Sequence, residues 1–192
     1  MKPNVALVGH SFVRRFKDSL DRARCSYKNQ LNVFDSAGSI YLYGKGGALT
    51  DQILSKFEPK STDILMLDIG TNDLCGSLNG EALASKVLHY VDEYVRCHPN
   101  LKLVYIFEII ERCRTRDVSK EHFDFERAIY NRKIDEAASK SPLISFCRHR
   151  GLDNIKEWSN DGIHPNTYIG MKQYKMNISN AIKDALYSLK SN

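Results

Sequence analysis

The sequence predicts an α/β fold, a three-layer α/β/α sandwich built around a mainly parallel sheet. Short apolar runs alternate along its 192 residues with longer segments in which apolar residues recur every three or four positions. The runs Val5–Val8 and Ile64–Leu67 are apolar without interruption, which is typical of strands buried on both faces. Because strands that alternate with helices pair in parallel and are covered on both sides, a three-layer arrangement is expected.

Each expected element is supported by its own pattern. Strands are expected where short apolar runs are bounded by polar or glycine residues, at Asn4–Gly9, Leu31–Phe34, Ile40–Leu42, Asp63–Ile69, Leu101–Phe107 and Leu143–Phe146. Helices are expected where apolar residues share one helical face, after Ser11 and over Thr50–Phe57, Gly80–His98, Lys120–Ser139 and Asn166–Leu189. No repeat or linker divides the chain, so we expect one domain over residues 1–192.

The composition indicates a globular protein without an export signal. Hydrophobic residues make up 42% of the chain and charged residues 27%, which is ordinary for globular domains. The apolar run after Asn4 is too short for a signal peptide, and no run approaches the roughly 20 residues that span a bilayer. Five cysteines without a Cys-x-x-Cys pair fit neither a disulfide framework nor a zinc ribbon. We therefore expect free thiols, an intracellular location and no cofactor.

Three loops that follow expected strands carry residues suited to catalysis, and ligands of such folds bind beyond the carboxyl ends of the strands. The Ser11 hydroxyl could cap the following helix, or it could be a nucleophile. The segment Gly44-Lys45-Gly46-Gly47 could be an ordinary turn, or its backbone N–H groups could approach a ligand. Asn72 could make local turn bonds, or its side chain could donate to an oxyanion.

The segment Asp161-Gly162-Ile163-His164-Pro165 precedes the last expected helix. Because a proline disfavours helical geometry at the residue before it, His164 should lie in the loop. Its imidazole could take a proton from a serine hydroxyl while the Asp161 carboxylate holds the other ring nitrogen in the required tautomer. A structural histidine or a metal ligand is the alternative. However, no pair among His10, His164, Asp161 and Asp73 has a recognised metal-ligand spacing.

Together these loops supply a nucleophile, oxyanion donors and an oriented base, which are the parts required for acyl transfer. The blocks resemble, in the same order, those of the SGNH (GDSL) hydrolases. The two most specific are Ile69-Gly70-Thr71-Asn72-Asp73 and Asp161-Gly162-Ile163-His164-Pro165. The resemblance runs from Val5 to the last expected helix. It implies a flavodoxin-like arrangement with a central five-stranded sheet and the activity of a serine esterase.

The resemblance also implies a role for individual residues. The nucleophile would be Ser11, the general base His164 and the residue that orients it Asp161. The oxyanion donors would be the backbone N–H groups of Ser11 and Gly47, with Gly46 as the neighbouring alternative, and the side chain of Asn72. The family usually has aspartate before the nucleophile, where this chain has His10. That histidine could point into the sheet or act as a titratable neighbour of the site.

The expected substrate is a small ester of a carbohydrate or lipid. No long apolar lid that could house a fatty chain is evident, so the acyl group is expected to be short, such as acetyl. Candidates for substrate contact are His10 and two residues of the Glu111–Arg116 loop, Arg112 and Arg114. Guanidinium groups there could bind an acidic substrate or a phosphate, although the loop could also be simply solvated.

A second hypothesis is a binding module that keeps the fold but has weak or no catalytic activity. The formal net charge of +5 would then attract nucleic acid or an anionic membrane surface. Related esterase domains are found in proteins encoded by mobile elements, beside nucleic-acid-binding segments. The sequence lacks the basic stripe interleaved with aromatic residues that is expected of a dedicated nucleic-acid binder.

Overall fold

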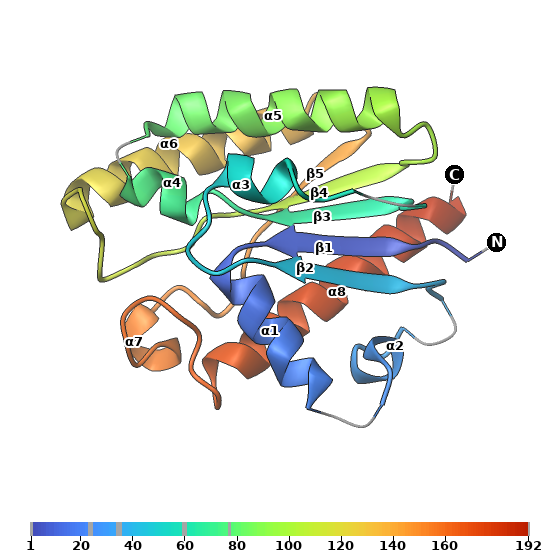
Figure 1. Cartoon of the computed structure of the whole chain (residues 1–192), viewed down its shortest axis with the longest axis horizontal. Coiled ribbons are helices and arrows are strands. Elements are labelled where there is room, and N and C mark those ends of the chain that lie inside the picture. The colour runs from blue at the N-terminus through green and yellow to red at the C-terminus, as the bar shows by residue number, and fades with distance from the viewer. Residues whose placement is uncertain (1, 23–24, 34–35, 59–60, 77, 192) are drawn as a thin grey trace.

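The computed structural model, shown in Figure 1, describes residues 2–22, 25–33, 36–58, 61–76 and 78–191. Its strands form one parallel sheet in the order β2-β1-β3-β4-β5. The strands are β1 (Val5–Gly9), β2 (Ile40–Gly44), β3 (Ile64–Asp68), β4 (Leu103–Phe107) and β5 (Ile144–Cys147). The expected five-stranded α/β fold is therefore confirmed.

Helices cover both faces of this sheet (Figure 1). One face carries α3 (Thr50–Leu54), α4 (Thr71–Cys75), α5 (Gly80–Cys97) and α6 (Lys120–Ala138). The other face carries the two helices α1 (Ser11–Asp21) and α8 (Gly170–Ser191). Two further short helices are α2 (Tyr27–Gln30) and α7 (Ile155–Trp158).

Alternation along the strands builds the two hydrophobic cores. In β1, Val5 and Leu7 pack in the core beneath α1 and α8, whereas Ala6 and Val8 pack in the core beneath α5 and α6. Successive side chains of a strand point to opposite faces, so an uninterrupted apolar run is what a doubly covered strand requires. The apolar run that predicted β1 thus supplies both layers at once.

The strand order creates a place for a site at the carboxyl edge. The chain passes from β1 to β2 on one side, and β3 lies on the other side of β1, so the loops after β1 and β3 diverge there. Gly70 begins the turn from β3 into α4 with a φ of +100°. A Cβ at this position would lie 2.9 Å from side-chain atoms of both Ile109 and Leu83. Glycine therefore meets a conformational and a steric requirement at this turn.

Two sequence-based expectations about elements need correction. Leu31–Phe34 was expected to be a strand, but Leu31 and Asn32 form a turn and Val33 has no regular structure, while Phe34 lies outside the described residues. Leu31 and Val33 are nevertheless buried, so the apolar pattern reflected burial and not strand geometry. The last helix begins at Gly170 and not at Asn166, since residues 167–169 form a turn. The Asn166 side chain accepts the backbone N–H groups of Ile169 and Gly170 across this turn.

Two further expectations concern the state of the cysteines and the presence of membrane-spanning helices. All five cysteines lie in the described part of the chain, and all are free, as their spacing predicted. Across that same part, no helix combines the length and the apolar character that crossing a membrane would require.

Candidate active site

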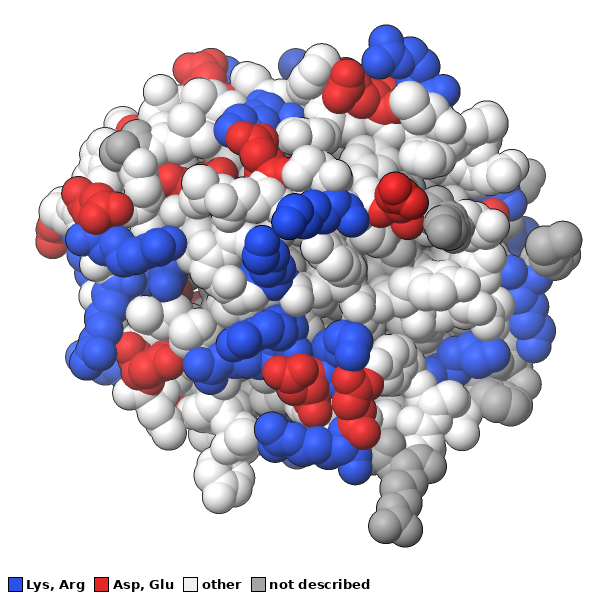
Figure 2. Space-filling view, in the orientation of Figure 1, with Lys and Arg blue, Asp and Glu red and all other residues white. Residues whose placement is uncertain are grey.

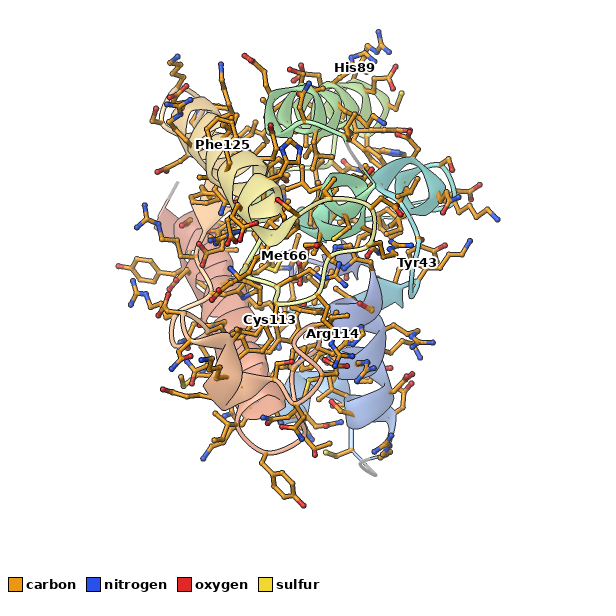
Figure 3. The ribbon with its side chains drawn as sticks, turned by 90° about the vertical axis from the view of Figure 1, so that its left-hand side faces the viewer. Tyr43, Met66, His89, Cys113, Arg114 and Phe125 are labelled. Carbon is orange, nitrogen blue, oxygen red and sulfur yellow. The ribbon has the colours of Figure 1, made fainter. Side chains whose placement is uncertain are left out.

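The loops that follow the strands meet at the carboxyl edge of the sheet. Figure 3 looks onto this edge, with Cys113 and Arg114 near its centre. The backbone N–H of Cys113 donates to the carbonyl of Gly162 at 2.9 Å. This bond joins the loop after β4 to the loop that carries Asp161 and His164, so two segments far apart in the sequence are held together at the candidate site.

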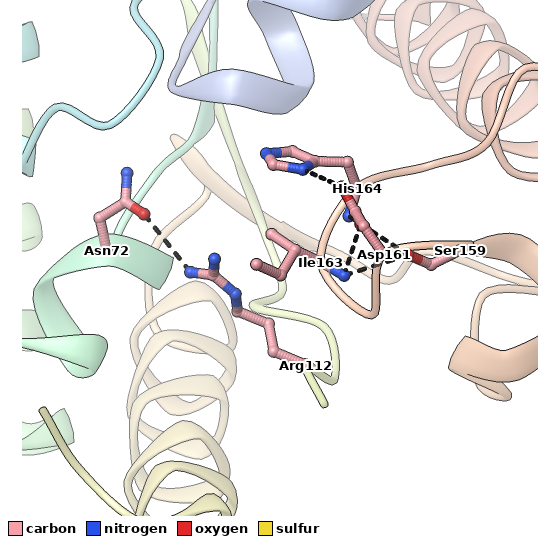
Figure 4. A network of polar contacts seen from close by, with 6 residues as sticks. All are labelled: Asn72, Arg112, Ser159, Asp161, Ile163 and His164. Atoms are coloured by element: carbon pink, nitrogen blue, oxygen red, sulfur yellow. Dashed lines mark hydrogen bonds and ion pairs between the residues drawn. The ribbon is translucent and has the colours of Figure 1, made fainter. Parts of the chain in front are cut away.

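Asp161 and His164 form a hydrogen-bonded pair (Figure 4). The His164 Nδ1 atom lies 2.8 Å from Asp161 Oδ2. The other carboxylate oxygen, Oδ1, accepts the backbone N–H groups of Ile163 and His164 and the hydroxyl of Ser159, at 2.9, 2.7 and 3.1 Å. Burial raises the pKa of Asp161, but the hydrogen bonds from His164 and Ile163 outweigh it and hold this pKa well below its usual range. The carboxylate is therefore ionised and fixed in place.

This hydrogen bond favours the His164 tautomer with the proton on Nδ1, which leaves Nε2 free to accept a proton. Burial lowers the pKa of His164, and the bond to Asp161 partly offsets that effect. The positive charges of Arg15 and Arg112 lower this pKa further. The imidazole is consequently neutral at neutral pH, as a general base must be.

Ser11 is the first residue of α1, and His10 occupies the N-cap position. Ser11 thus lies inside the helix and not at the N-cap, and among the described residues its hydroxyl has no hydrogen-bond partner, so the capping interpretation is not supported. The ring of Phe12, the next residue, lies 6.2 Å from the His164 ring, centroid to centroid. His164 thus lies beside the segment that carries Ser11, while direct contact between the two remains a prediction.

The expected oxyanion donors lie on neighbouring loops. Gly47 has a φ of +71°, and no atom lies within 4 Å of the position a Cβ would take, so one side of this residue is open. The buried Asn72 amide donates to the carbonyl of Ala48 at 2.9 Å. Asp73 accepts the backbone N–H and the hydroxyl of Thr50 at 3.0 and 2.9 Å. Asn72 and Asp73 therefore tie the loop after β3 to the loop that contains Gly47, and one N–H of the Asn72 amide remains for another acceptor.

The three candidates for substrate contact differ in their surroundings. Arg112 is buried, and its Nη1 atom lies 3.4 Å from Asn72 Oδ1, whereas Arg114 is exposed. His10 is buried, and both of its ring nitrogens are enclosed without a hydrogen-bond partner. Burial, together with Arg112 and His164, lowers the pKa of His10 to about 3. The ring is therefore neutral near pH 7, which does not favour a role as a titratable neighbour.

A comparison with known families decides the assignment. The model of the GDSL-like Lipase/Acylhydrolase family matches residues 7–168. The chain belongs to this family. It is accordingly a serine ester hydrolase, as the ordered sequence blocks predicted.

Solved structures of similar fold cover nearly the whole GDSL-like chain. A GDSL-like lipase from Bacteroides thetaiotaomicron is 20% identical, with a TM-score of 0.68 over 95% of this chain and 88% of the other. A carbohydrate esterase family 3 protein from Talaromyces cellulolyticus is 17% identical, with a TM-score of 0.65 over 96% and 98%. A variant of an acetyl-xylooligosaccharide esterase from Geobacillus is 14% identical, with a TM-score of 0.66 over 96% and 94%. A search among curated proteins finds no match.

A buried polar cluster packs behind the nucleophile segment of this GDSL-like hydrolase, and the sequence did not predict it. The Tyr174 hydroxyl donates to Asp68 Oδ2 at 2.5 Å, and the buried His149 ring stacks on Tyr174. Burial raises the pKa of Asp68 to about 6, although the bond from Tyr174 opposes this shift. The Tyr174 ring also meets Phe12 edge-on at 5.9 Å. No sequence motif indicates this cluster, because Asp68 and Tyr174 are 106 residues apart.

The metal alternative finds no ligand set in the residues that the structure describes. No group of three or more His, Cys, Asp or Glu side chains there could hold a metal ion. Asp161 is instead bonded to His164, and Asp73 is bonded to Thr50.

Charge is mixed on one face of the GDSL-like hydrolase. Figure 2 shows Lys and Arg side chains interspersed with Asp and Glu over the face that it presents. A continuous basic stripe along that face would favour nucleic-acid binding, and the interspersed pattern does not.

Proposed function

We propose that the chain hydrolyses small esters through an acyl-enzyme, with Ser11 as nucleophile, His164 as general base and Asp161 as the residue that orients it. The observation that carries this proposal is the fixed Asp161–His164 pair beside the segment that bears Ser11. The free hydroxyl of Ser11 and the neutral state of His164 are both what such a base and nucleophile require.

In the proposed reaction Ser11 Oγ attacks the ester carbonyl, and His164 Nε2 accepts the hydroxyl proton. The resulting tetrahedral oxyanion would be bound by the backbone N–H groups of Ser11 and Gly47 and by the free N–H of Asn72. His164 then donates its proton to the leaving alcohol, which releases it and leaves the acyl group on Ser11. Water, deprotonated by His164, attacks the acyl-enzyme and frees the acid.

The proposed acyl group is short, with acetyl as the first candidate. The Geobacillus structure is named an acetyl-xylooligosaccharide esterase and the Talaromyces structure a carbohydrate esterase. In addition, no long apolar lid is evident in the sequence. Together with those names, this favours an acetylated carbohydrate or a comparably small ester over a long-chain lipid.

The test is labelling and turnover by the purified chain. A fluorophosphonate probe should label Ser11, and p-nitrophenyl acetate should be hydrolysed faster than the butyrate and octanoate. Ser11→Ala should abolish labelling and lower kcat by roughly 10⁴-fold or more, as removal of a triad nucleophile does.

Ser19→Ala is the matched control. Ser19 lies on the same helix, and its hydroxyl donates to the carbonyl of Phe16. This variant should keep both labelling and turnover. Persistent labelling of the Ser11→Ala protein would show that the nucleophile is a different residue.

A further inference from the structure

Arg112 is a buried cation without a carboxylate partner. Its residue is only 7% exposed. The Nη1 atom contacts an amide oxygen and a thiol sulfur, Asn72 Oδ1 at 3.4 Å and Cys75 Sγ at 3.2 Å, and the buried Nε atom has no hydrogen-bond partner among the described residues. Among the ion pairs of the described chain none includes Arg112. Burying a charge in this state is costly, and an anion bound beside the guanidinium would offset that cost.

Arg112 lies at the candidate reaction centre. Figure 4 shows its side chain between Asn72 and the loop of Ile163 and His164, with the guanidinium turned toward the space between them. The positive charge of Arg112 lowers the pKa of both His10 and His164. Because Arg112 Nη1 also lies 3.4 Å from Oδ1 of Asn72, the expected oxyanion donor, a substrate bound beside Asn72 would lie next to the guanidinium.

The neighbouring charges do not neutralise this arginine. Burial, with the positive charge of Arg116, leaves the pKa of Arg112 lowered, although Cys75 and Asp161 favour its charged form. The oxygens of Asp161 are already bonded to His164 and the adjacent backbone. Glu111, the residue before Arg112, forms its ion pair with Lys120 at 2.9 Å. Arg15 adds a second positive charge from α1, since it also lowers the pKa of His164. The site therefore has an excess of positive charge that a ligand can compensate.

We infer that the ester substrate carries a negatively charged group, a carboxylate or phosphate, which pairs with the Arg112 guanidinium. A planar guanidinium binds such anions through two parallel hydrogen bonds, which gives orientation as well as affinity. The inference rests on the proposed function of Ser11 and His164, and it names the class of ester that the site selects. A substrate anion bound there would hold the ester at a fixed angle beside Asn72.

Two matched pairs of esters test this selectivity. The first pair places the charge on the acyl side, p-nitrophenyl hemisuccinate against its neutral methyl ester. The second places it on the alcohol side, p-acetoxybenzoate against its methyl ester. The wild-type chain should prefer the anionic member of at least one pair by about tenfold in kcat/KM, the size expected of one charge-assisted contact.

Substitution of Arg112 should remove the preference. Arg112→Gln should bring the ratio of anionic to neutral kcat/KM near one, and Arg112→Lys should keep part of it because the charge remains without the planar fork. Arg96→Gln, which removes an exposed charge from the end of α5, should leave the ratio unchanged. Because Arg112 lowers the pKa of His164, Arg112→Gln should also move the acid limb of the neutral-ester pH profile to higher pH.

The outcomes separate this inference from the proposed function. Turnover of neutral esters with labelled Ser11, but no wild-type preference for the anionic member of either pair, would overturn the anionic-substrate inference alone. An anionic preference that survives in both Arg112 variants would overturn it as well. Failure of wild-type Ser11 to react with the fluorophosphonate probe would instead overturn the proposed function on which it rests.

Discussion

At the scale of single residues, Asp161 uses its two carboxylate oxygens for different tasks. Oδ1 accepts hydrogen bonds from Ser159, Ile163 and His164, which fixes the carboxylate relative to its own loop. Oδ2 is left to face the His164 ring. The division explains how two residues only three positions apart can form an oriented pair without support from distant chain.

This division predicts the effect of Asp161→Asn. Three donors face the Oδ1 position, so the amide oxygen of asparagine should stay there, and its NH₂ group should then face His164 Nδ1. That ring nitrogen would have to accept, which moves the proton to Nε2 and removes the base. We expect kcat to fall by roughly 10³–10⁴-fold in steady-state assays, with little change in thermal stability.

The counterpart variant is Asp161→Glu, which keeps the charge but shifts its position. A kcat of the Asp161→Asn protein that stays within about tenfold of wild type would contradict the assigned tautomer.

At the scale of elements, the end of β3 is attached to α8 through a buried carboxyl group. Asp68 closes β3 and accepts the hydroxyl of Tyr174 from α8. Burial raises the folded-state pKa of Asp68 from 3.8 to about 6. As the pH rises, Asp68 therefore loses its proton in the unfolded chain before it does so in the folded chain. The free energy of unfolding consequently falls from about pH 4 to pH 6.

We predict that Asp68→Asn gains stability relative to wild type as the pH rises. An asparagine oxygen can still accept from Tyr174, and it does not ionise. The difference in the free energy of unfolding should shift in favour of the variant by up to about 3 kcal/mol between pH 4 and pH 7, measured by chemical denaturation.

Tyr174→Phe should strengthen the pH dependence of stability that Asp68→Asn removes. The bond from Tyr174 lowers the pKa of Asp68, so its loss should raise that pKa and steepen the fall in stability toward neutral pH. A stability difference between Asp68→Asn and wild type that does not vary with pH would show that Asp68 keeps an ordinary pKa in the folded chain.

At the scale of the whole molecule, features with a local signature could be predicted from the sequence. The doubly buried strands and the long helices α5 and α6 follow from apolar runs and helical periodicity. Because all strands are parallel, residues that follow them gather at one edge, which is why separate weak motifs pointed to one site.

The remaining features depend on tertiary context. The short helices α2, α4 and α7 span four or five residues, too few for a periodic pattern. Leu31 and Val33 show that a buried irregular segment has the same apolar pattern as a strand. The burial of Arg112 against Asn72 joins residues 40 apart, and no rule of spacing distinguishes it from its exposed neighbour Arg114.

The most direct measurement is a crystal structure of the chain after reaction with a fluorophosphonate. We expect phosphorus bonded to Ser11 Oγ and His164 Nε2 within hydrogen-bonding distance of the adduct. One phosphoryl oxygen should accept from the N–H groups of Ser11, Gly47 and Asn72. An adduct on another residue, or one on Ser11 with the His164 ring out of reach, would contradict the pairing of nucleophile and base.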